Sequence, residues 1–424
     1  MQVRLEYGRN GLTVELPDEN LASVLKLQPA PYIEDSHAAV AEALGNPIDS
    51  LPLEYLARGR KDACIVVCDV TRPVPNTVLL PPILGALERA GLSREKVTIL
   101  IATGTHRPND GAELDDMLGR EIAQTCRIVN HVCADRTSHV SLGTTDAGVP
   151  VWLDRTYCEA DLKITVGLIE PHFMAGYSGG RKLVMPGLAA LETVQAWHSP
   201  RFLEHPRASN GIVEGNPVHE ESLRIARMAP PDMIVDVTLD EQNRITGVFT
   251  GDLERAWLHG VEFAERSVRV PVAEPVDIVV TTCAGHPLDA TFYQAVKGMV
   301  GALPIVKPGG SIVIAASCSE GVGGADFVRT LLETQDLQQF VRDIQRPDWT
   351  FIPDQWEVEE LAKATQNCRV YCVCDGIPRE TLSRLFVTPA ASVERAVEAA
   401  VGRHGGAATI IAIPKGPYVI PYVA

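Results

Sequence analysis

Runs of consecutive apolar residues that alternate with amphipathic stretches dominate the chain. Residues 63–70, 97–103 and 161–166 are such runs, as is typical of strands buried on both faces of a sheet. Residues 76–90 instead repeat their apolar positions with a helical period. Residues 233–237 predict one more strand. Strands that alternate with helices predict an α/β fold, with a mostly parallel sheet flanked by helices.

This rhythm breaks once and then restarts, which predicts two domains. Residues 270–275 hold two prolines in a short mixed stretch and are predicted to form a linker. Beyond it the pattern predicts a helix at 292–300, strands at 277–282 and 311–316, then further helices, and strands at 369–373 and 407–413. A length of 424 residues also exceeds what one ordinary core supports.

The domain boundaries follow from this break. We predict an N-terminal α/β domain over residues 1–270 that opens with a hairpin at residues 3–16. We predict a C-terminal α/β domain over residues 276–404. Residues 405–424 are expected to pack back on the N-terminal domain.

Composition and charge narrow the class of protein. Hydrophobic residues make up 46% of the chain and charged residues 22%, which is ordinary for a globular protein. A net charge of -16 argues against nucleic acid or an anionic membrane as the main partner. No segment is long and apolar enough to cross a membrane, and the N-terminus lacks a signal-peptide core. We therefore expect a cytoplasmic protein, for which a small anionic substrate remains possible.

The ten cysteines are expected to be reduced thiols. Four of them lie in or beside apolar runs, where core packing is the simplest interpretation: Cys64, Cys68, Cys283 and Cys318. Cys372 and Cys374 form a C-x-C pair, but the chain offers no second pair at the spacing of a zinc finger. A zinc site there is therefore only weakly supported.

Two short motifs directly follow buried strands, where ligands gather in open α/β sheets. In the first, Arg72 precedes a proline and is expected to be extended, so that it holds a carboxylate while Asp69 orients it. The alternative is a surface ion pair. In the second motif, Gly104 follows Thr103 and permits close approach to a ligand, and His106 is a candidate proton carrier. The alternative is a histidine that caps the next helix.

The third motif, Glu-Pro-His-Phe-Met-Ala-Gly-Tyr-Ser-Gly-Gly-Arg-Lys, covers residues 170–182. His172 is a second candidate proton carrier. The amides of Ser178, Gly179 and Gly180 are predicted to cradle an anion. Lys182 is not part of a Walker loop, because the second glycine and the Ser or Thr of that pattern are missing. It is instead a candidate nucleophile or covalent cofactor anchor.

Two further segments carry single candidate groups. His198 ends a helix-like stretch and has no second histidine at metal-binding spacing, so packing is the simpler interpretation unless a cofactor supplies the other ligands. In the second half of the chain Tyr293, Gln294 and Lys297 lie within about one turn of a predicted helix. An exposed lysine without function is the alternative there.

Taken in order, these five motifs resemble the nickel-dependent lactate racemase family over nearly the whole chain. They are Asp69-x-Thr-Arg72-Pro, Thr103-Gly-Thr-His106-Arg, Glu170-Pro-His172 with Ser178-Gly-Gly-x-Lys182-x-x-x-Pro-Gly, the helix that ends at His198, and Tyr293-Gln-Ala-Val-Lys297-Gly. The resemblance implies a racemase or epimerase of a small 2-hydroxy acid such as lactate or malate. It also implies a two-domain α/β fold with the active site in the interdomain cleft.

The family's cofactor is a nickel-pincer nucleotide, a pyridinium-3,5-bisthiocarboxylic acid mononucleotide that grips nickel through sulfur, carbon and sulfur. The resemblance implies that Lys182 carries it covalently and that His198 is the fourth nickel ligand. The cofactor-binding group would further include Asp69, Thr103, Gly104, Ser178, Gly179, Gly180 and, near the metal, Trp356.

The resemblance also implies roles around the substrate. The C2 hydride moves to the cofactor and back, while His106 and His172 exchange the hydroxyl proton, one for each hand of the substrate. Arg72 would clamp the carboxylate, and Tyr293, Gln294 and Lys297 would position the substrate. Arg181 and His286 are departures that could mark a substrate other than lactate.

Partners and alternatives follow from the same resemblance. Cofactor-building and nickel-insertion proteins are the expected partners, and the oligomeric state stays open. One alternative is a non-catalytic paralogue that holds the cofactor. Another is a Schiff-base enzyme of the pyridoxal-phosphate type, with Lys182 as its lysine.

Overall fold

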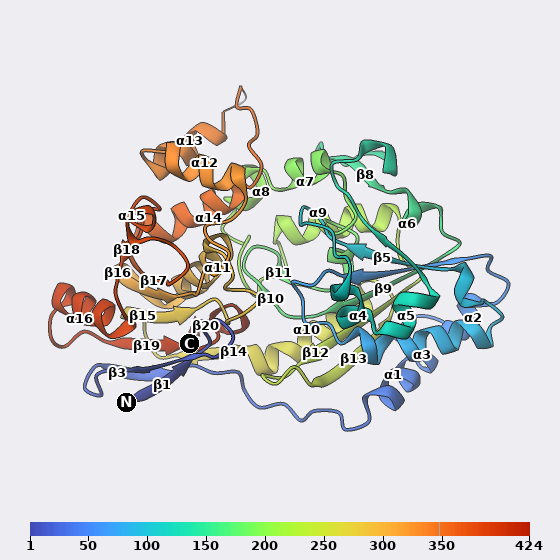
Figure 1. Cartoon of the computed structure of the whole chain (residues 1–424), viewed down its shortest axis with the longest axis horizontal. Helices are drawn as coiled ribbons and strands as arrows, with labels where there is room; N and C mark the ends of the chain where they lie inside the picture. The colour runs from blue at the N-terminus through green and yellow to red at the C-terminus, as the bar shows by residue number, and fades with distance from the viewer. Residues whose placement is uncertain (347) are drawn as a thin grey trace. The chain divides into compact units, whose positions relative to one another are not determined.

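Two structural units divide the chain in the computed structural model, which describes residues 1–346 and 348–424 (Figure 1). The continuous unit consists of Pro29–Arg266. The discontinuous unit combines Met1–Gln28 with Ser267–Ala424. Each unit is built around its own six-stranded sheet, so the predicted α/β class with two domains is confirmed.

The sheet of the continuous unit has the strand order β13-β12-β9-β4-β5-β6. All neighbours run parallel except β13, which is antiparallel to β12. The strands are β4 (Ala63–Cys68), β5 (Val97–Ala102), β6 (Arg127–Asn130), β9 (Leu162–Leu168), β12 (Met233–Leu239) and β13 (Ile245–Gly251). Two hairpins stand beside the sheet, β7 (His139–Thr144) with β8 (Pro150–Asp154) and β10 (Pro171–His172) with β11 (Gly176–Tyr177).

Helices cover this sheet. They are α1 (Ser36–Gly45), α2 (Leu53–Ala57), α3 (Asn76–Arg89), α4 (Ala112–Leu118), α5 (Arg120–Thr125), α6 (Arg155–Glu159), α7 (Leu191–Trp197), α8 (Pro200–Leu203), α9 (Pro217–Met228) and α10 (Arg255–Val268), with 3-10 turns η1 (Arg94–Lys96), η2 (Arg136–Ser138) and η3 (Gly180–Leu183). Apolar residues of α1, α2 and α3 form one core with β4, β5, β9 and β12. The strands and the helix predicted for this part of the chain are confirmed, within one to two residues at most ends.

The sheet of the discontinuous unit is parallel throughout, in the order β18-β17-β16-β15-β19-β3. Its strands are β3 (Leu21–Val24), β15 (Val276–Thr282), β16 (Val306–Ala315), β17 (Arg369–Val373), β18 (Thr388–Pro389) and β19 (Ile410–Ile413), and two smaller pairs are β1 (Gln2–Leu5) with β2 (Leu12–Glu15) and β14 (Arg269–Val272) with β20 (Ile420–Val423). The helices are α11 (Phe292–Ala302), α12 (Ala325–Glu333), α13 (Leu337–Ile344), α14 (Gln355–Gln366), α15 (Arg379–Leu382) and α16 (Val393–His404), with 3-10 turns η4 (Leu303–Ile305) and η5 (Gly416–Tyr418).

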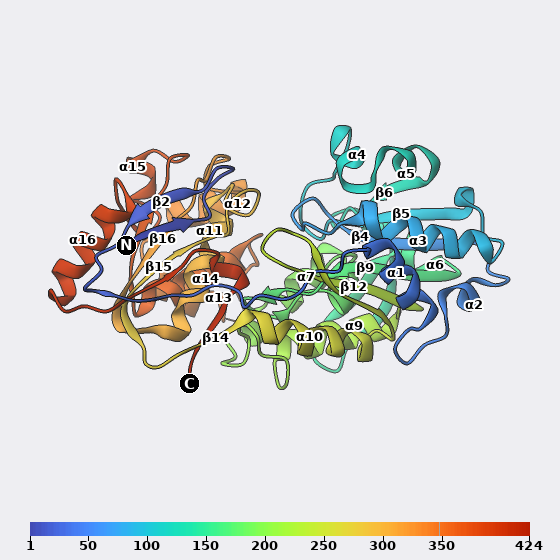
Figure 2. The same ribbon diagram turned by 90° about the horizontal axis from the view of Figure 1, so that it is seen from below.

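The N-terminal hairpin forms as predicted, but it belongs to the discontinuous unit and not with the rest of residues 1–270. Its apolar side chains Val3, Leu5, Val14 and Leu16 are buried with those of α16 and one face of that unit's sheet. The ribbon in Figure 2 shows β2 close to α16. The following strand β3 extends the same sheet by pairing with β19. The continuous unit therefore begins only at Pro29, because the first residues bury their apolar faces elsewhere.

The second half of the chain differs from the prediction in two places. Residues 270–275 were predicted to be a linker, yet β14 lies there and pairs in parallel with β20. Residues 405–424 were expected to pack on the N-terminal domain, yet they fall within the discontinuous unit, where β19 pairs with both β15 and β3. Helices α11, α12, α13 and α14 share a core with the other face of this sheet. Within the described residues, no helix has both the length and the apolar character needed to cross a membrane.

Candidate active site

Three loops at the carboxyl edge of the continuous unit's sheet carry most of the candidate residues. Asp69 follows β4, Thr103 follows β5, and residues 169–183 follow β9. In the sheet β4 lies between β5 and β9, so parallel pairing brings the three loops to the same edge. The sequence predicts each of these three loops separately, and the strand order places them next to one another.

His106 is held by Asp69. The Nδ1 atom of His106 lies 2.6 Å from Oδ2 of Asp69, whose other oxygen accepts hydrogen bonds from the amide and hydroxyl of Thr71. Burial by itself raises the pKa of Asp69, but the hydrogen bond and charge of His106, with the Thr71 hydroxyl, lower it below its usual value. His106 is thus a partly exposed imidazole with an ionised carboxylate behind it, and its ring bonds Asp69 in place of the helix-capping role considered above.

Arg72 is oriented by Glu170. Its Nε atom lies 3.1 Å from Oε1 of Glu170, and both side chains are mostly buried. That Asp69 orients Arg72 stays a prediction: the carboxylate of Asp69 bonds His106 and Thr71, and the charge of Arg72 helps to lower the pKa of Asp69. Glu170 is the first residue of the motif at residues 170–182, and the sequence alone predicts no role for it. Its position two residues before His172, at the end of a strand that neighbours β4, was the available signal.

His172 and Lys182 lie in contact. The Nζ atom of Lys182 is 3.0 Å from Nε2 of His172. The other ring nitrogen, Nδ1, accepts hydrogen bonds from the amides of Met174 at 3.4 Å and Ala175 at 3.1 Å. Backbone amides only donate, so Nδ1 is the nitrogen that faces them and Nε2 is the nitrogen that faces the lysine. The hairpin of β10 and β11 thereby fixes which nitrogen of His172 lies against Lys182.

His198 is a buried imidazole at the end of α7. Its amide donates to the carbonyl of Val194, and its ring lies 4.4 Å from the ring of Trp197. Burial first, and the nearby charge of Lys182 second, hold the pKa of His198 well below its usual value. The ring is therefore neutral, which is the form that binds a metal ion.

Two of the three amides that were predicted to cradle an anion donate hydrogen bonds within the protein. The amide of Ser178 donates to the carbonyl of Glu170, and the amide of Gly180 donates to Oδ2 of Asp236 at 2.7 Å. A Cβ at Gly179 would lie 2.9 Å from Asp236, and one at Gly180 would lie 2.8 Å from the ring of Trp257. These glycines, both with positive φ, allow the loop to pack closely on the protein itself.

The loop after β5 is tied down in the same way. The hydroxyl of Thr103 donates to the carbonyl of His131 at 2.7 Å, and the amide of Gly104 donates to the carbonyl of Gly187. Gly104 has φ +55, a conformation that favours glycine. The described contacts of Thr103 and Gly104 thus link the loop that carries His106 to the segment that follows Lys182.

The candidate residues of the discontinuous unit gather on α11 and α14. Thr291 caps α11, which presents Tyr293, Gln294 and Lys297. The indole nitrogen of Trp356 donates to the hydroxyl of Tyr293 at 2.7 Å. Burial, followed by the charges of nearby carboxylates, raises the pKa of Tyr293 well above its usual value. The structure therefore brings Trp356 to the motif on α11, although 63 positions separate it from Tyr293.

Glu357, next to Trp356, is a group that sequence reasoning missed. It is buried, and neither carboxylate oxygen has a hydrogen-bond partner within residues 1–346 and 348–424. Burial raises its pKa to about 8, against the lowering effect of Lys297. Nothing in a helix rich in glutamate marks this one as buried, because burial depends on the packing of α14 against α11.

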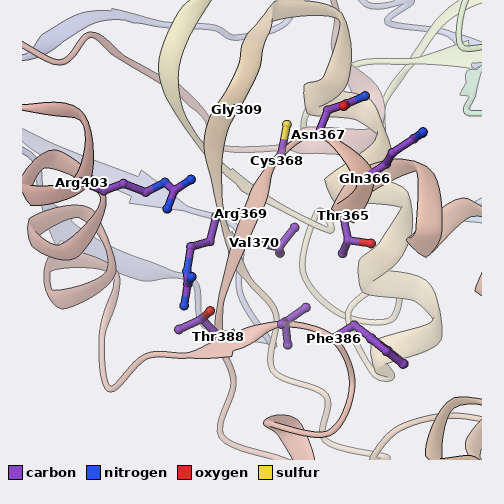
Figure 3. Close-up of a pocket in the computed structure, with 11 residues that line it drawn as sticks. Gly309, Thr365, Gln366, Asn367, Cys368, Arg369, Val370, Phe386, Thr388 and Arg403 are labelled. Atoms are coloured by element: carbon purple, nitrogen blue, oxygen red, sulfur yellow. The ribbon is translucent and has the colours of Figure 1, made fainter. Parts of the chain in front are cut away.

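Elsewhere in the discontinuous unit, a pocket of about 520 Å³ opens at the amino end of β17 (Figure 3). Arg369, Arg403, Phe386 and Thr388 are among the residues that line it, and none of the candidate residues does. In the part of the chain that the structure describes, no three His, Cys, Asp or Glu side chains gather as a metal site, and all ten cysteines are free. A zinc site at Cys372 and Cys374 gains no support.

Known families match both halves of the chain. The lactate racemase N-terminal domain matches residues 7–211, and the lactate racemase C-terminal domain matches residues 272–421. The second match begins close to the boundary at Ser267 between the two units.

Two curated relatives match this chain over nearly its full length. A lactate racemase of Lactiplantibacillus plantarum is 37% identical over 421 residues, which cover 99% of each chain. A lactate racemase of Thermoanaerobacterium thermosaccharolyticum is 36% identical over 99% of this chain and 98% of its own. The solved structure of the lactate racemase apoprotein from the same organism superposes with a TM-score of 0.93 at 35% identity, over 99% of this chain and all of its own.

Proposed function

Since the chain belongs to the lactate racemase family, an isomerase family, we propose that it interconverts the two hands of a small 2-hydroxy acid. The observation that carries the proposal is a pair of fixed histidines in the continuous unit, His106 on Asp69 and His172 beside Lys182. A reaction that inverts one centre needs a proton carrier for each hand. Lactate is the first substrate to test because the relatives are named for it, and malate is the second.

We infer that the cofactor is a nickel-pincer nucleotide, because the residues present fit such a group. Lys182 offers an amine for a covalent tether, and His198 offers a buried neutral imidazole for nickel. A cofactor that supplies three ligands needs only one from the protein, which suits a chain whose described residues hold no cluster of three ligands. When bound, this group supplies the acceptor for the hydrogen at C2 of the substrate.

The two histidines then take the substrate's hydroxyl proton in turn. Asp69 occupies Nδ1 of His106, which leaves Nε2 for the proton of one hand. The ring of His172 turns Nδ1 toward the amides of Met174 and Ala175, so Nε2 is the nitrogen proposed to exchange the proton of the other hand. Each ring is thus held by one nitrogen and works with the other, as general acid–base catalysis requires.

Arg72 is proposed to hold the substrate carboxylate. A guanidinium can bond a carboxylate through two parallel N–H groups, and the contact of Nε with Glu170 fixes its plane. On the discontinuous unit, Gln294 and Lys297 are proposed to position the hydroxy acid. Tyr293 and Trp356, locked together by their hydrogen bond, are proposed to face the substrate and cofactor.

The proposed function also implies partner proteins and a cellular compartment. The protein would depend on cofactor-building and nickel-insertion proteins, as family membership implies. Ten free cysteines fit a reducing compartment, and a cytoplasmic location is proposed on that ground.

The decisive experiment measures intact mass, nickel content and turnover on protein made together with the cofactor-building proteins. We expect one added nucleotide per chain, about one nickel, and formation of the opposite enantiomer from pure D- or L-lactate or malate. Lys182→Ala should lose the added mass, whereas Lys61→Ala, at an exposed lysine, should keep it. An unmodified mass without nickel would favour the non-catalytic paralogue. A borohydride-reactive imine at Lys182 would favour a Schiff-base enzyme.

A further inference from the structure

Arg181 is a charged side chain buried beneath the proposed catalytic groups. Its side chain is 1% exposed, and its neighbour in sequence is Lys182. Burial lowers the pKa of Arg181 to about 9, while the charge of Asp236 opposes that change, so the guanidinium stays charged near neutral pH.

The guanidinium joins two segments that must stay in register. Its Nη2 atom donates to the carbonyl of Ala175 at 2.8 Å and to the carbonyl of Tyr177 at 3.0 Å. Both carbonyls belong to the hairpin that carries His172, and Ala175 also donates its amide to Nδ1 of that ring. Arg181 itself stands in η3 beside Lys182. One side chain thus connects the backbone around His172 to the turn that carries Lys182.

Two neighbours fix the other side of this connection. The Cζ atom of Arg181 lies 4.1 Å from the ring centroid of Trp257, as in a cation–π contact, and the Trp257 indole donates to the carbonyl of Ser178 at 2.7 Å. Asp236 on β12 accepts the amide of Gly180. His219 on α9 stacks on Trp257 with 5.1 Å between ring centroids. Strand β12 and helix α10 therefore bond the turn directly, and α9 supports the ring of Trp257.

Stability alone is a poor explanation for this arrangement. Nε and Nη1 of Arg181 and Oδ1 of Asp236 have no hydrogen-bond partner in the portion of the chain that the structure describes. A buried pair of charges often contributes no more to stability than apolar side chains of similar volume would. The bonds that Arg181 does make to the Ala175 and Tyr177 carbonyls therefore point to a role in local geometry.

We propose that Arg181 is a positioning residue that holds His172 and Lys182 at contact distance. The proposal rests on the proposed function for the roles of His172 and Lys182, and it assigns to Arg181 the geometry between them. Nε2 of His172 lies 3.0 Å from Nζ of Lys182, so loss of register should remove the contact through which the imidazole can accept the proton that acylation of the amine releases.

The test uses the full-length chain without cofactor and measures acylation of each lysine by acetic anhydride with mass spectrometry. Exposed Lys61 is the internal reference. In Arg181→Met we expect the ratio of Lys182 to Lys61 rates to fall about fivefold or more, and in Arg181→Lys to fall about half as far, because a small displacement of reacting groups has a large effect on rate. Arg155→Lys, at an exposed arginine that pairs with Glu159, should leave the ratio unchanged.

A ratio within about twofold of wild type in an Arg181→Met protein that still unfolds cooperatively would overturn the proposal. Should that variant not fold, Arg181→Lys keeps the charge but cannot reach both carbonyls with one planar group, and an unchanged ratio in that variant would equally overturn the proposal. In loaded enzyme, kcat should fall while KM stays constant, because Arg72 is untouched. Wild-type protein that racemises no hydroxy acid would refute the proposed function, while the ratio in cofactor-free protein would still decide the role of Arg181.

Discussion

Replacing Asp69 with Asn tests the proposed acid–base role of His106 most directly. The change keeps the shape of the side chain and removes its charge. Asp69 is 5% exposed and lies 2.6 Å from Nδ1 of His106. Although burial works against it, the bonds from His106 and Thr71 lower the pKa of Asp69, so the wild-type carboxylate is ionised at neutral pH. The variant therefore removes a negative charge that stabilises a protonated His106.

The expected size of the effect follows from the type of hydrogen bond. A bond to a charged group contributes about 1.5–3 kcal/mol, against about 1 kcal/mol for a neutral pair. The difference of about 0.5–2 kcal/mol corresponds to a loss of about 2- to 30-fold in kcat/KM. His106 is 39% exposed, and water screens part of the interaction, so the lower half of that range is expected.

The assay is racemisation of each pure enantiomer by loaded enzyme, followed by chiral chromatography, with cofactor content checked by intact mass. Asp135→Asn is a matched control, because Asp135 makes the same turn with Thr137 but lies on an exposed loop. It should retain wild-type activity. An Asp69→Asn enzyme with equal cofactor content and more than about half of wild-type kcat/KM would refute the reasoning.

Three further predictions use other contacts of the two units. Glu170→Gln should raise KM about three- to tenfold with little change in kcat, because Arg72 loses a charged partner whose bond contributes about 1 kcal/mol to its orientation. Steady-state kinetics on loaded enzyme measure both constants. An unchanged KM would count against Arg72 as the residue that binds the carboxylate. Glu357 has a folded pKa of about 8, so between about pH 4.5 and 8 the folded state keeps a proton that the unfolded chain loses, and the free energy of unfolding falls as pH rises. Glu357→Gln should lack that fall in urea unfolding at pH 5 and pH 8, and equal pH dependence in both proteins would show the carboxyl group to be solvated. His198→Ala should lose about tenfold or more of the bound nickel while the mass of the tethered group remains, whereas His205→Ala, at an exposed histidine, should keep its nickel; equal metal content in both variants would exclude His198 as ligand.

The sequence already contained the motifs, their order and most of the strands. A parallel strand buried on both faces of a sheet is a run of apolar residues, because both faces need apolar side chains. This pattern correctly predicted β4, β5, β9, β12 and β15. The rule that ligands lie beyond the carboxyl ends of such strands then selected the loops that carry His106, His172 and Lys182. For these elements, local pattern and tertiary structure agree.

The packing and pairing of the short elements could not be predicted from the sequence, because their burial depends on residues far away in the chain. The hairpin of β1 and β2 was predicted, but four apolar side chains on two strands do not reveal which sheet they cover. Likewise β14 contains Pro271 and is followed by Pro275, so the sequence there resembles a linker. Its hydrogen-bond partner is β20, which lies about 150 residues later in the chain. No window of neighbouring residues contains that information.

The choice of partners among charged groups also belongs to the tertiary structure. Sequence placed Asp69 near Arg72, whereas the sheet order brings Glu170 to Arg72 and leaves Asp69 for His106. Gly179 and Gly180 suggested an anion site, and only the position of Asp236 and Trp257 beneath them shows that the loop packs on the protein itself. By itself the sequence determined which chemical groups are present and on which loops, because those depend on local pattern. Which group meets which was decided by strand order and helix packing, since contacts between residues far apart in the chain exist only once the sheet has formed.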